Sequence, residues 1–169
     1  MRRRPGVEGG CPSCAAEAKG LSKYAIRDND PVLYFEHKAL YRRVKEDIPE
    51  GDFTVPIGKA AIVREGRDLS ILTYGAMVHV AREGAVTLEK EGISIEIVDL
   101  RTLAPLDEDT VLASVRKTSK VLLLHEDTLT GGIGGELAAR ISEKAFEYLD
   151  GPIVRVTAPD KIGRAHGGT

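Results

Sequence analysis

The feature that most constrains the fold is a regular alternation of short β-rich runs and longer helical stretches, which begins at residue 69. The β-rich runs are residues 69–74, 93–98, 121–124 and 153–156. Consecutive strands joined by helices pair in parallel, because the helical crossover returns the chain to the same end of the sheet. The last-but-one run is wholly apolar, as a strand covered on both faces should be. The alternation therefore predicts an α/β fold with a mostly parallel five-stranded sheet and helices on both faces.

The helical stretches between these runs carry recognisable start and stop signals. Residues 76–91 place a stripe of apolar residues on one face, and Gly92 follows as a terminating residue. The next helix opens at Asp107, with acidic residues in its first turn and basic residues in its last, which suits the helix dipole. A third helix is expected to reach residue 150, with Ala138, Ile141, Ala145 and Tyr148 at helical spacing.

The chain before residue 59 is organised differently. Residues 15–27 have helical periodicity and residues 32–35 have the pattern of a strand, but residues 36–56 contain no convincing periodic element. A connection of this length is unusual within one compact domain. We therefore predict three parts, which are the last helix and strand of a preceding domain (1–37), an interdomain linker (38–58) and the main domain (59–160).

Composition and charge exclude several classes of protein. The formal net charge of -2 offers no general attraction to nucleic acid or anionic lipid, both of which bind clustered positive charge. The apolar stretches fall far short of the roughly 20 residues needed to span a bilayer, and no apolar run follows the basic start as it would in a secretory signal. We expect a cytoplasmic protein, or a mitochondrial matrix protein in a eukaryote, with no nucleic-acid or membrane partner.

Cys11 and Cys14 form a lone Cys-Pro-Ser-Cys sequence, a spacing found in redox pairs and in halves of zinc sites. The chain has no second cysteine pair, and its four His, at positions 37, 79, 125 and 166, are scattered. A redox pair should also follow a strand and open a helix, whereas glycine-rich residues precede Cys11. We therefore favour a structural role for both cysteines.

Residues 131–135 form a glycine-rich loop between a strand and a helix, where backbone N–H groups can hold an anion. A dinucleotide fingerprint requires a third glycine three residues after the second, and Leu137 occupies that position. A tight turn with close backbone packing accounts for the glycines without a ligand. We favour the turn and keep a nucleotide-binding regulator as an alternative.

Two histidines lie near the ends of predicted strands. His125, Glu126 and Asp127 follow an apolar run, at the edge where open α/β sheets usually hold ligands. A His beside two acids can act as a base, but no nucleophile or metal partner accompanies this one in the sequence. We therefore favour an interface role for His125 and Glu126, and a packing or capping role for His79.

The segment from Asp28 to Pro31 joins a predicted helix to a predicted strand. Its Asp and Asn residues favour a polar turn, and Pro31 stops the helix. Carboxylate oxygens and helix-end carbonyls are also ligands for hard cations. The spacing by itself favours the turn.

Several motifs, in order along the chain, resemble those of one protein family. They include Ala25-Ile-Arg-Asp-Asn-Asp-Pro31, Phe35-Glu-His-Lys38, Leu72-Thr-Tyr-Gly-Ala-Met-Val-His79, Val98-Asp-Leu-Arg-Thr102 and His125-Glu126 followed by Thr130-Gly-Gly132. Over residues 12–159 the chain resembles the beta subunit of the thiamine-diphosphate-dependent decarboxylating component of 2-oxo acid dehydrogenase complexes. The resemblance implies a transketolase-like carboxy-terminal domain, preceded by the end of a pyrimidine-binding domain.

The resemblance also implies a reaction, cofactors and partners. Members of this family decarboxylate a 2-oxo acid and transfer the acyl group to lipoyl, using thiamine diphosphate and Mg bound in a heterotetramer. The family's cofactor-contacting Glu and catalytic His precede the matched region, so no catalytic or cofactor-binding residue is assigned and the chain alone is expected to be inactive and not to bind the cofactor. The implied partners are an alpha subunit, a second beta subunit, and the lipoyl acyltransferase through its subunit-binding domain.

Ala25, Ile26, Asp28 and Asp30 fall where many relatives hold a structural potassium ion with helix-end carbonyls and side-chain oxygens. The family often has Asn at the last of these positions, so Asp30 is a departure. The resemblance implies that part of that site comes from the preceding segment.

An acidic surface around Asp107, Glu108 and Asp109 suits a basic docking partner. Together with His79, His125 and Glu126, these three residues are our candidates for interfaces and docking.

Both ends of the chain depart from the family. Residues 1–10 stand where relatives have an apolar strand, and residues 161–169 replace a final helix with a sequence like a translated sequencing adapter. We expect both ends to be non-native and the chain to be a truncated beta subunit whose remaining role is assembly and docking. The alternatives are a non-catalytic α/β binding module and the nucleotide-binding regulator.

Overall fold

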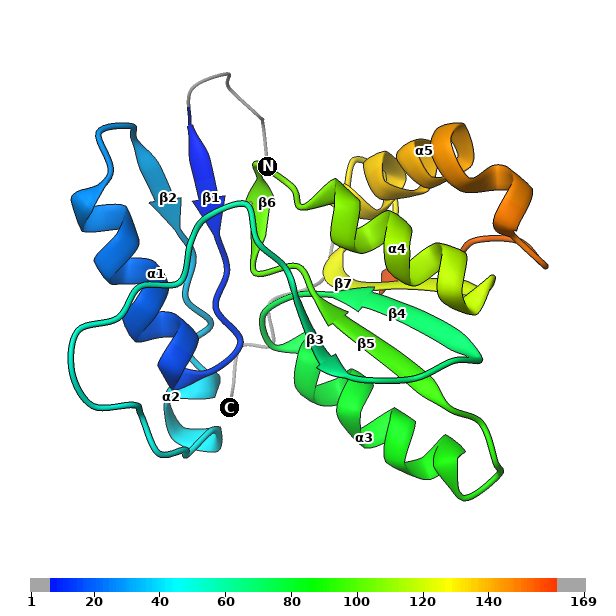
Figure 1. Cartoon of the computed structure of the whole chain (residues 1–169), viewed down its shortest axis with the longest axis horizontal. Helices are drawn as coiled ribbons and strands as arrows, with labels where there is room; N and C mark the ends of the chain where they lie inside the picture. Colours follow the sequence, from blue (N-terminus) through cyan, green and yellow to red (C-terminus); the bar gives the residue numbers. More distant parts are fainter. Residues whose placement is uncertain (1–6, 161–169) are drawn as a thin grey trace, which may run out of the picture.

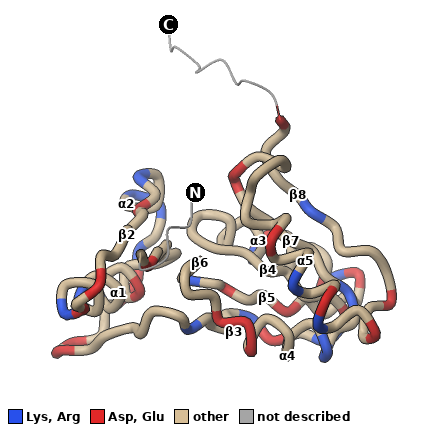
Figure 2. Tube along the Cα trace, turned by 90° about the horizontal axis from the view of Figure 1, so that it is seen from above, with Lys and Arg blue, Asp and Glu red and all other residues tan. Residues whose placement is uncertain are grey.

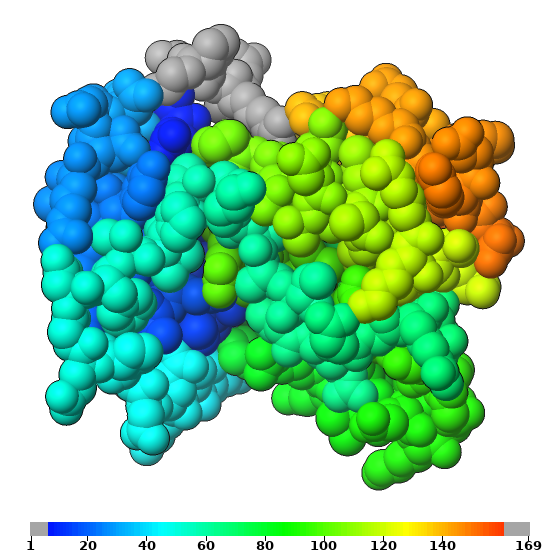
Figure 3. Space-filling view, in the orientation of Figure 1, coloured from blue at the N-terminus to red at the C-terminus, as the bar shows by residue number. Residues whose placement is uncertain are grey.

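The structure is a computed structural model that describes residues 7–160, so the predicted artefactual tail at 161–169 lies outside the described residues. Two units lie side by side, a smaller one formed mainly by residues 7–43 and a larger one that follows a long connection (Figures 1 and 3). Basic and acidic residues are interspersed over both units (Figure 2). No helix in the described range is long and apolar enough to cross a membrane.

A five-stranded sheet forms the centre of the larger unit. Its strands lie in the order β3-β5-β4-β7-β8, where β4 pairs in parallel with β5 and β7, and β7 pairs in parallel with β8. The edge strand β3 is antiparallel to β5. The bounds are β3 (Ala61–Arg64), β4 (Leu69–Thr73), β5 (Ile95–Asp99), β7 (Val121–Thr128) and β8 (Val154–Ala158). This confirms the predicted α/β fold with a mostly parallel five-stranded sheet.

Helices cover both faces of this sheet, as predicted. Helix α3 (Met77–Glu89) lies on one face, and α4 (Glu108–Thr118) and α5 (Ile133–Ala145) lie on the other (Figure 1). Successive side chains of a strand point to opposite faces. Ile71 and Ile97 therefore join the core beneath α3, whereas Leu72 and Val98 join the larger core beneath α4 and α5.

Helix α4 begins and ends as its sequence predicts. The Asp107 side chain accepts a hydrogen bond from the backbone N–H of Thr110, and thereby caps the free N–H groups of the first turn. At the other end Ser119 adopts a left-handed conformation with φ 57°, and its N–H donates to the Val115 carbonyl.

The smaller unit contains α1 (Ala15–Arg27) and a three-stranded sheet in the order β2-β1-β6. Strands β1 (Glu8–Gly10) and β2 (Val32–Tyr34) pair in parallel, and β6 (Thr102–Ala104) comes from the later part of the chain. Residues 8–10, which were expected to be non-native, thus form a strand of this sheet, and their non-native origin stays a prediction. A Glu-Gly-Gly sequence has little strand propensity, so this strand depends on backbone pairing with segments distant in the sequence.

The connection between the units lies against α1. It contains the short helix α2 (Leu40–Arg43) and otherwise no helix or strand up to β3. A Cβ atom added to Gly20 of α1 would lie 2.5 Å from Val55 Cγ2, which shows how closely the two segments approach. Two lysines of α1 reach the connection, with Lys19 Nζ 2.7 Å from the Pro49 carbonyl oxygen and Lys23 Nζ 2.8 Å from Asp52 Oδ1.

The carboxyl ends of β7 and α5 differ from those predicted. Strand β7 continues to Thr128, four residues beyond the apolar run, since Thr128 also pairs with Ala158 of the edge strand β8 after an irregularity in the register. Helix α5 ends at Ala145, and a single 3₁₀ turn, η1 (Phe146–Tyr148), follows. Tyr148, which was expected to continue the spacing of this helix, lies instead in the 3₁₀ turn, where its ring stacks with Arg116 and its side chain is 41 % exposed.

Candidate functional site

A cavity of about 630 Å³ lies between the two units. From the larger unit it is lined by residues at the carboxyl ends of β4 and β7, such as Tyr74 and Glu126, and by the start of α5. From the smaller unit it is lined by residues that follow β1 and β2, including Cys11 and His37. Open α/β sheets hold their ligands at this edge, and the volume falls within the range of small-molecule sites. We therefore take this interunit cavity as the candidate functional site.

Polar contacts join the two units at the wall of the interunit cavity. His37 Nε2 of the smaller unit lies 3.3 Å from Glu126 Oε2 at the end of β7. Glu126 is exposed and lines the cavity, so the structure places this predicted interface residue at the edge where the sequence analysis expected it.

His125 has a different environment from its neighbour. Its ring is 4 % exposed, stacks on Tyr74 with a centroid distance of 6.4 Å, and accepts a hydrogen bond from the Gly134 N–H at 3.2 Å. Burial lowers the pKa of His125 below its usual range, so the ring is held neutral. The expectation that His125 is available for docking is therefore wrong, because alternation along β7 turns its side chain beneath α5 instead of outward.

The glycine-rich loop is shaped by this buried histidine. A Cβ atom added to Gly132 would lie 2.4 Å from the Thr128 carbonyl oxygen, and one added to Gly134 would lie 2.5 Å from His125 Nε2. Both positions therefore require glycine so that the backbone can close over the ring. Close packing explains these glycines, which is the interpretation that the sequence analysis favoured over nucleotide binding.

A second polar cluster connects α1 with the larger unit through an ion pair and hydrogen bonds. Arg101 Nε lies 2.6 Å from Glu17 Oε1, and the backbone N–H of Ser13 donates to Glu17 Oε2 at 3.0 Å. His79 Nε2 is 2.8 Å from the Ser13 carbonyl oxygen. The packing contact of His79 thus joins the two units. A role of His79 in docking stays a prediction.

Asp99 lies at this junction between the units and is fully buried. Its Oδ1 accepts a hydrogen bond from the Arg101 N–H at 2.9 Å, while Oδ2 has no hydrogen-bond partner among the described residues. Burial, followed by the nearby Glu17 carboxylate, raises the pKa of Asp99 to about 7. Sequence reasoning missed this group, although an acid directly after the β-rich run 93–98 was a signal that could have found it.

Neither cysteine has the properties of a redox or metal-binding thiol. Both are free. Burial raises the pKa of Cys11 to about 12, and burial also dominates in raising the pKa of Cys14 to about 11. The reactive thiolate forms are therefore scarce at neutral pH, which supports the structural role favoured from the sequence.

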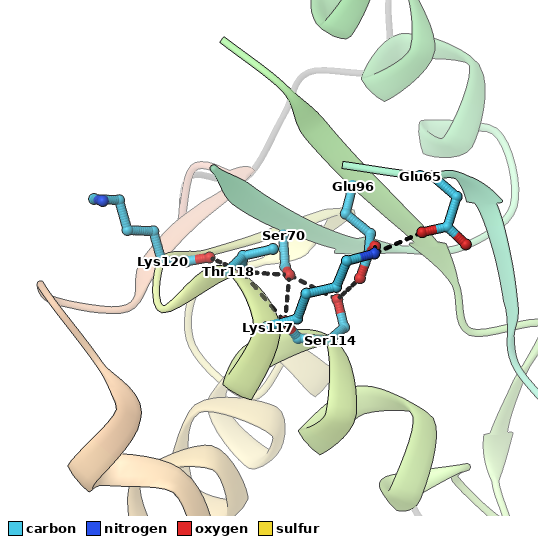
Figure 4. A network of polar contacts seen from close by, with 7 residues as sticks. All are labelled: Glu65, Ser70, Glu96, Ser114, Lys117, Thr118 and Lys120. Carbon is cyan, nitrogen blue, oxygen red and sulfur yellow. Dashed lines mark hydrogen bonds and ion pairs between the residues drawn. The ribbon is translucent and has the colours of Figure 1, made fainter. Parts of the chain in front are cut away.

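A buried acid also lies within the larger unit, toward the amino ends of its strands (Figure 4). Glu96 of β5 is fully buried, accepts a hydrogen bond from Ser114 Oγ at 2.7 Å and pairs with Lys117 of α4. Lys117 Nζ also lies 2.6 Å from Glu65 Oε2, so one ammonium group compensates two carboxylates. The network lies at the opposite end of the sheet from the interunit cavity, and its role is to fix α4 on the sheet.

The acidic surface proposed from the sequence is largely occupied by contacts within the chain. Asp107 is 5 % exposed, caps α4 and accepts from the Ala60 N–H, and Glu108 pairs with Arg140 and Lys144. The expectation that Asp107 is available for docking is therefore wrong, because the capping position buries its carboxylate. Asp109, one residue further along the helix, is exposed.

The candidate potassium residues lie at the end of α1 and in the turn that follows. Asp28 Oδ1 accepts a hydrogen bond from the Asp30 N–H at 2.9 Å, which is the polar turn favoured by the spacing. Ile26 is 84 % exposed. Within residues 7–160 no group of three or more His, Cys, Asp or Glu side chains is arranged to hold a metal ion. These observations leave potassium binding through carbonyl oxygens as a prediction.

Comparison with known proteins covers both units. The family model described as the transketolase C-terminal domain matches residues 58–167. The chain is 48 % identical over 162 residues to the pyruvate dehydrogenase E1 component subunit beta of Bacillus subtilis, which covers 96 % of this chain and 50 % of that protein. It is 50 % identical over 157 residues to the 2-oxoisovalerate dehydrogenase subunit beta of the same organism, covering 93 % and 48 %.

A solved structure has the same fold. It is named "Split gene transketolase, inactive beta4 tetramer", and it superposes with a TM-score of 0.79 and 30 % sequence identity over 98 % of this chain and 53 % of that one. The chain spans about half the length of the curated relatives it matches.

Proposed function

The chain belongs to the transketolase carboxy-terminal domain family, and we propose that it forms part of the beta subunit of a 2-oxo acid dehydrogenase. The observation that carries this proposal is the 48 % identity to a pyruvate dehydrogenase beta subunit over 96 % of the chain, because the match includes the smaller unit as well as the family domain. The whole enzyme would decarboxylate a 2-oxo acid and pass the acyl group to lipoyl. This portion would serve assembly and docking.

We propose that the thiamine diphosphate and its Mg are held by other parts of the assembly. The loop at the amino end of α5 has the right place in the fold for a diphosphate, but His125 fills the space behind Gly132 and Gly134. The described residues also lack a side-chain cluster suited to a metal ion. The residues present therefore do not fit this cofactor, and no step of the reaction is assigned to them.

We propose that the smaller unit is the end of a pyrimidine-binding domain and that residues 38–58 link it to the carboxy-terminal domain. The carbonyls of Ala25 and Ile26, with Asp28 and Asp30, would contribute to a potassium site completed by residues of the same domain. The pairing of β1 with β6 and the ion pair between Arg101 and Glu17 support one rigid arrangement of the two units.

The proposed partners are an alpha subunit, a second beta subunit and the subunit-binding domain of the lipoyl acyltransferase. Surface available for such contacts includes Asp109 on α4 and the side chains of Val154 and Val156 on the edge strand β8, which are 47 % and 45 % exposed. Apolar side chains on an unpaired sheet edge are typical of surfaces that another chain covers.

Reconstitution tests this function. The purified chain is mixed with the alpha subunit of the Bacillus subtilis pyruvate dehydrogenase, and complex formation is measured by light scattering after size exclusion. Decarboxylation is measured by reduction of an artificial electron acceptor. We expect a complex without turnover, and we expect the chain to lower the activity of the intact enzyme by competing with its beta subunit. Absence of both association and competition would contradict the proposal.

Docking is tested separately with the acyltransferase subunit-binding domain. We expect Asp109→Asn to weaken binding, because it removes an exposed charge that would face a basic partner. Asp47→Asn, an exposed acid on the connection between the units, is the matched control. Equal binding by both variants and the unmodified chain would rule out docking through α4.

A further inference from the structure

We propose that the interunit cavity binds an organic cation, namely an ammonium group carried on an apolar body. Four of the side chains that line this cavity are acidic, Glu36, Glu126, Asp127 and Glu136, and none of its described lining residues is Lys or Arg. The inference concerns this chain alone and stands independently of the proposed dehydrogenase role.

The walls between these acids are apolar and partly aromatic. Phe35 of the smaller unit and Tyr74 of the larger unit line the cavity, together with Leu103 and Ile133. Aromatic faces attract cations through the ring quadrupole, and apolar walls bury the rest of such a ligand. The chemistry of the walls therefore matches both parts of an amphipathic amine.

The carboxylates differ in how far their charge is already compensated. Glu136 pairs with Arg140 at 2.7 Å, and Glu36 accepts a hydrogen bond from the Tyr41 hydroxyl at 2.6 Å. Glu126 has the His37 ring at 3.3 Å, which compensates charge only when protonated. Asp127 Oδ1 accepts a hydrogen bond from the Thr128 N–H at 2.8 Å. Glu126 and Asp127, which pair with no Lys or Arg among the described residues, are thus the lining carboxylates best placed to pair with a ligand's ammonium group.

One feature of the cavity favours the opposite charge. The amino end of α5 lies at its wall, and a helix amino end carries the equivalent of roughly half a positive charge. Four carboxylates outweigh this partial charge, and Glu136 in the first turn of α5 already complements it. The net field in the cavity therefore favours a cation over a phosphate or carboxylate.

Three probe molecules of similar shape, one cationic, one neutral and one anionic, test the inference. Benzylammonium, benzyl alcohol and benzoate are titrated into the full chain at neutral pH, and binding is followed by ligand-observed NMR and by the ring resonances of Tyr74. We expect benzylammonium to bind about tenfold more tightly than benzyl alcohol, as one well-placed charge pair allows, and benzoate not to bind. Equal affinity for the three probes, or no binding of benzylammonium, would overturn the proposal.

Substitutions of the lining carboxylates identify which of them binds the ammonium group. Glu126→Gln should weaken benzylammonium binding severalfold and leave benzyl alcohol unchanged. Glu91→Gln, an exposed acid just beyond α3 and outside the cavity, should change neither. Circular dichroism establishes that each variant is folded, and Asp127→Asn provides a second substitution in the cavity if Glu126→Gln is not. If both cavity variants bind benzylammonium as the unmodified chain does, the carboxylates do not form the site.

Discussion

Replacing Asp99 by Asn tests how a buried acid affects the junction between the two units. The carboxyl group is fully buried, and only Oδ1 has a hydrogen-bond partner among the described residues. The Glu17 carboxylate lies nearby and is itself paired with Arg101. An ionised Asp99 therefore places an incompletely compensated charge beside a second negative charge. Asn keeps the shape and the acceptor for the Arg101 N–H but cannot ionise.

The sign of the effect follows from the direction of the pKa shift. Burial raises the pKa of Asp99 from 3.8 to about 7 in the folded chain. The folded state binds this proton more tightly than the unfolded state, so the stabilisation is present in full below pH 3.8 and is lost as pH rises through about 7. At 1.36 kcal/mol for each pKa unit, the free energy of unfolding should fall by about 2–3 kcal/mol between roughly pH 5 and pH 8 through this group.

Urea unfolding, followed by circular dichroism at several pH values, measures this change in the free energy of unfolding. Other acids titrate over the same range, so the informative quantity is the difference in free energy of unfolding between Asp99→Asn and the unmodified chain. We expect this difference to shift in favour of the variant as pH rises, by about 2–3 kcal/mol over the whole interval. Asp47→Asn, at an exposed position, is the control and should show no such trend. A constant difference for Asp99→Asn would refute the reasoning.

Five further substitutions, at four positions, test the packing of the larger unit by thermal and urea unfolding. Lys117→Met should lower the thermal midpoint, because buried Glu96 loses its cationic partner, and Lys117→Arg should lower it less. Gly66→Ala should cost about 1–3 kcal/mol or prevent folding, because the added Cβ would lie 2.1 Å from the backbone of β5, whereas Gly84→Ala meets no neighbour within 4 Å and should gain about 0.5–1 kcal/mol. Leu72→Ala should cost about 2–5 kcal/mol, since this side chain is 1 % exposed in the main core. Stabilities of these variants within error of the unmodified chain would show that the corresponding contacts are absent in solution.

The sequence by itself determined the architecture of the larger unit. The alternation of β-rich and helical runs gave a mostly parallel sheet, and the charges and the cap at Asp107 gave the correct start of α4. These signals are local, since helix periodicity and capping arise from residues within one or two turns of each other. The ordered motifs were equally readable without a structure, and the transketolase-like carboxy-terminal domain that they implied is the family that the comparisons show.

Only the tertiary structure decided which polar groups are available at the surface. His125 and Glu126 are neighbours in the sequence, yet one is buried beneath a glycine loop and the other lines the interunit cavity. Likewise, β1 exists because backbone groups of Gly9 and Gly10 pair with residues of β6 more than 90 positions away. Pairing and burial of this kind are stabilised by contacts between segments that are distant in the sequence. Local sequence patterns do not reveal these contacts, so the exposure of these polar groups could not be predicted from them.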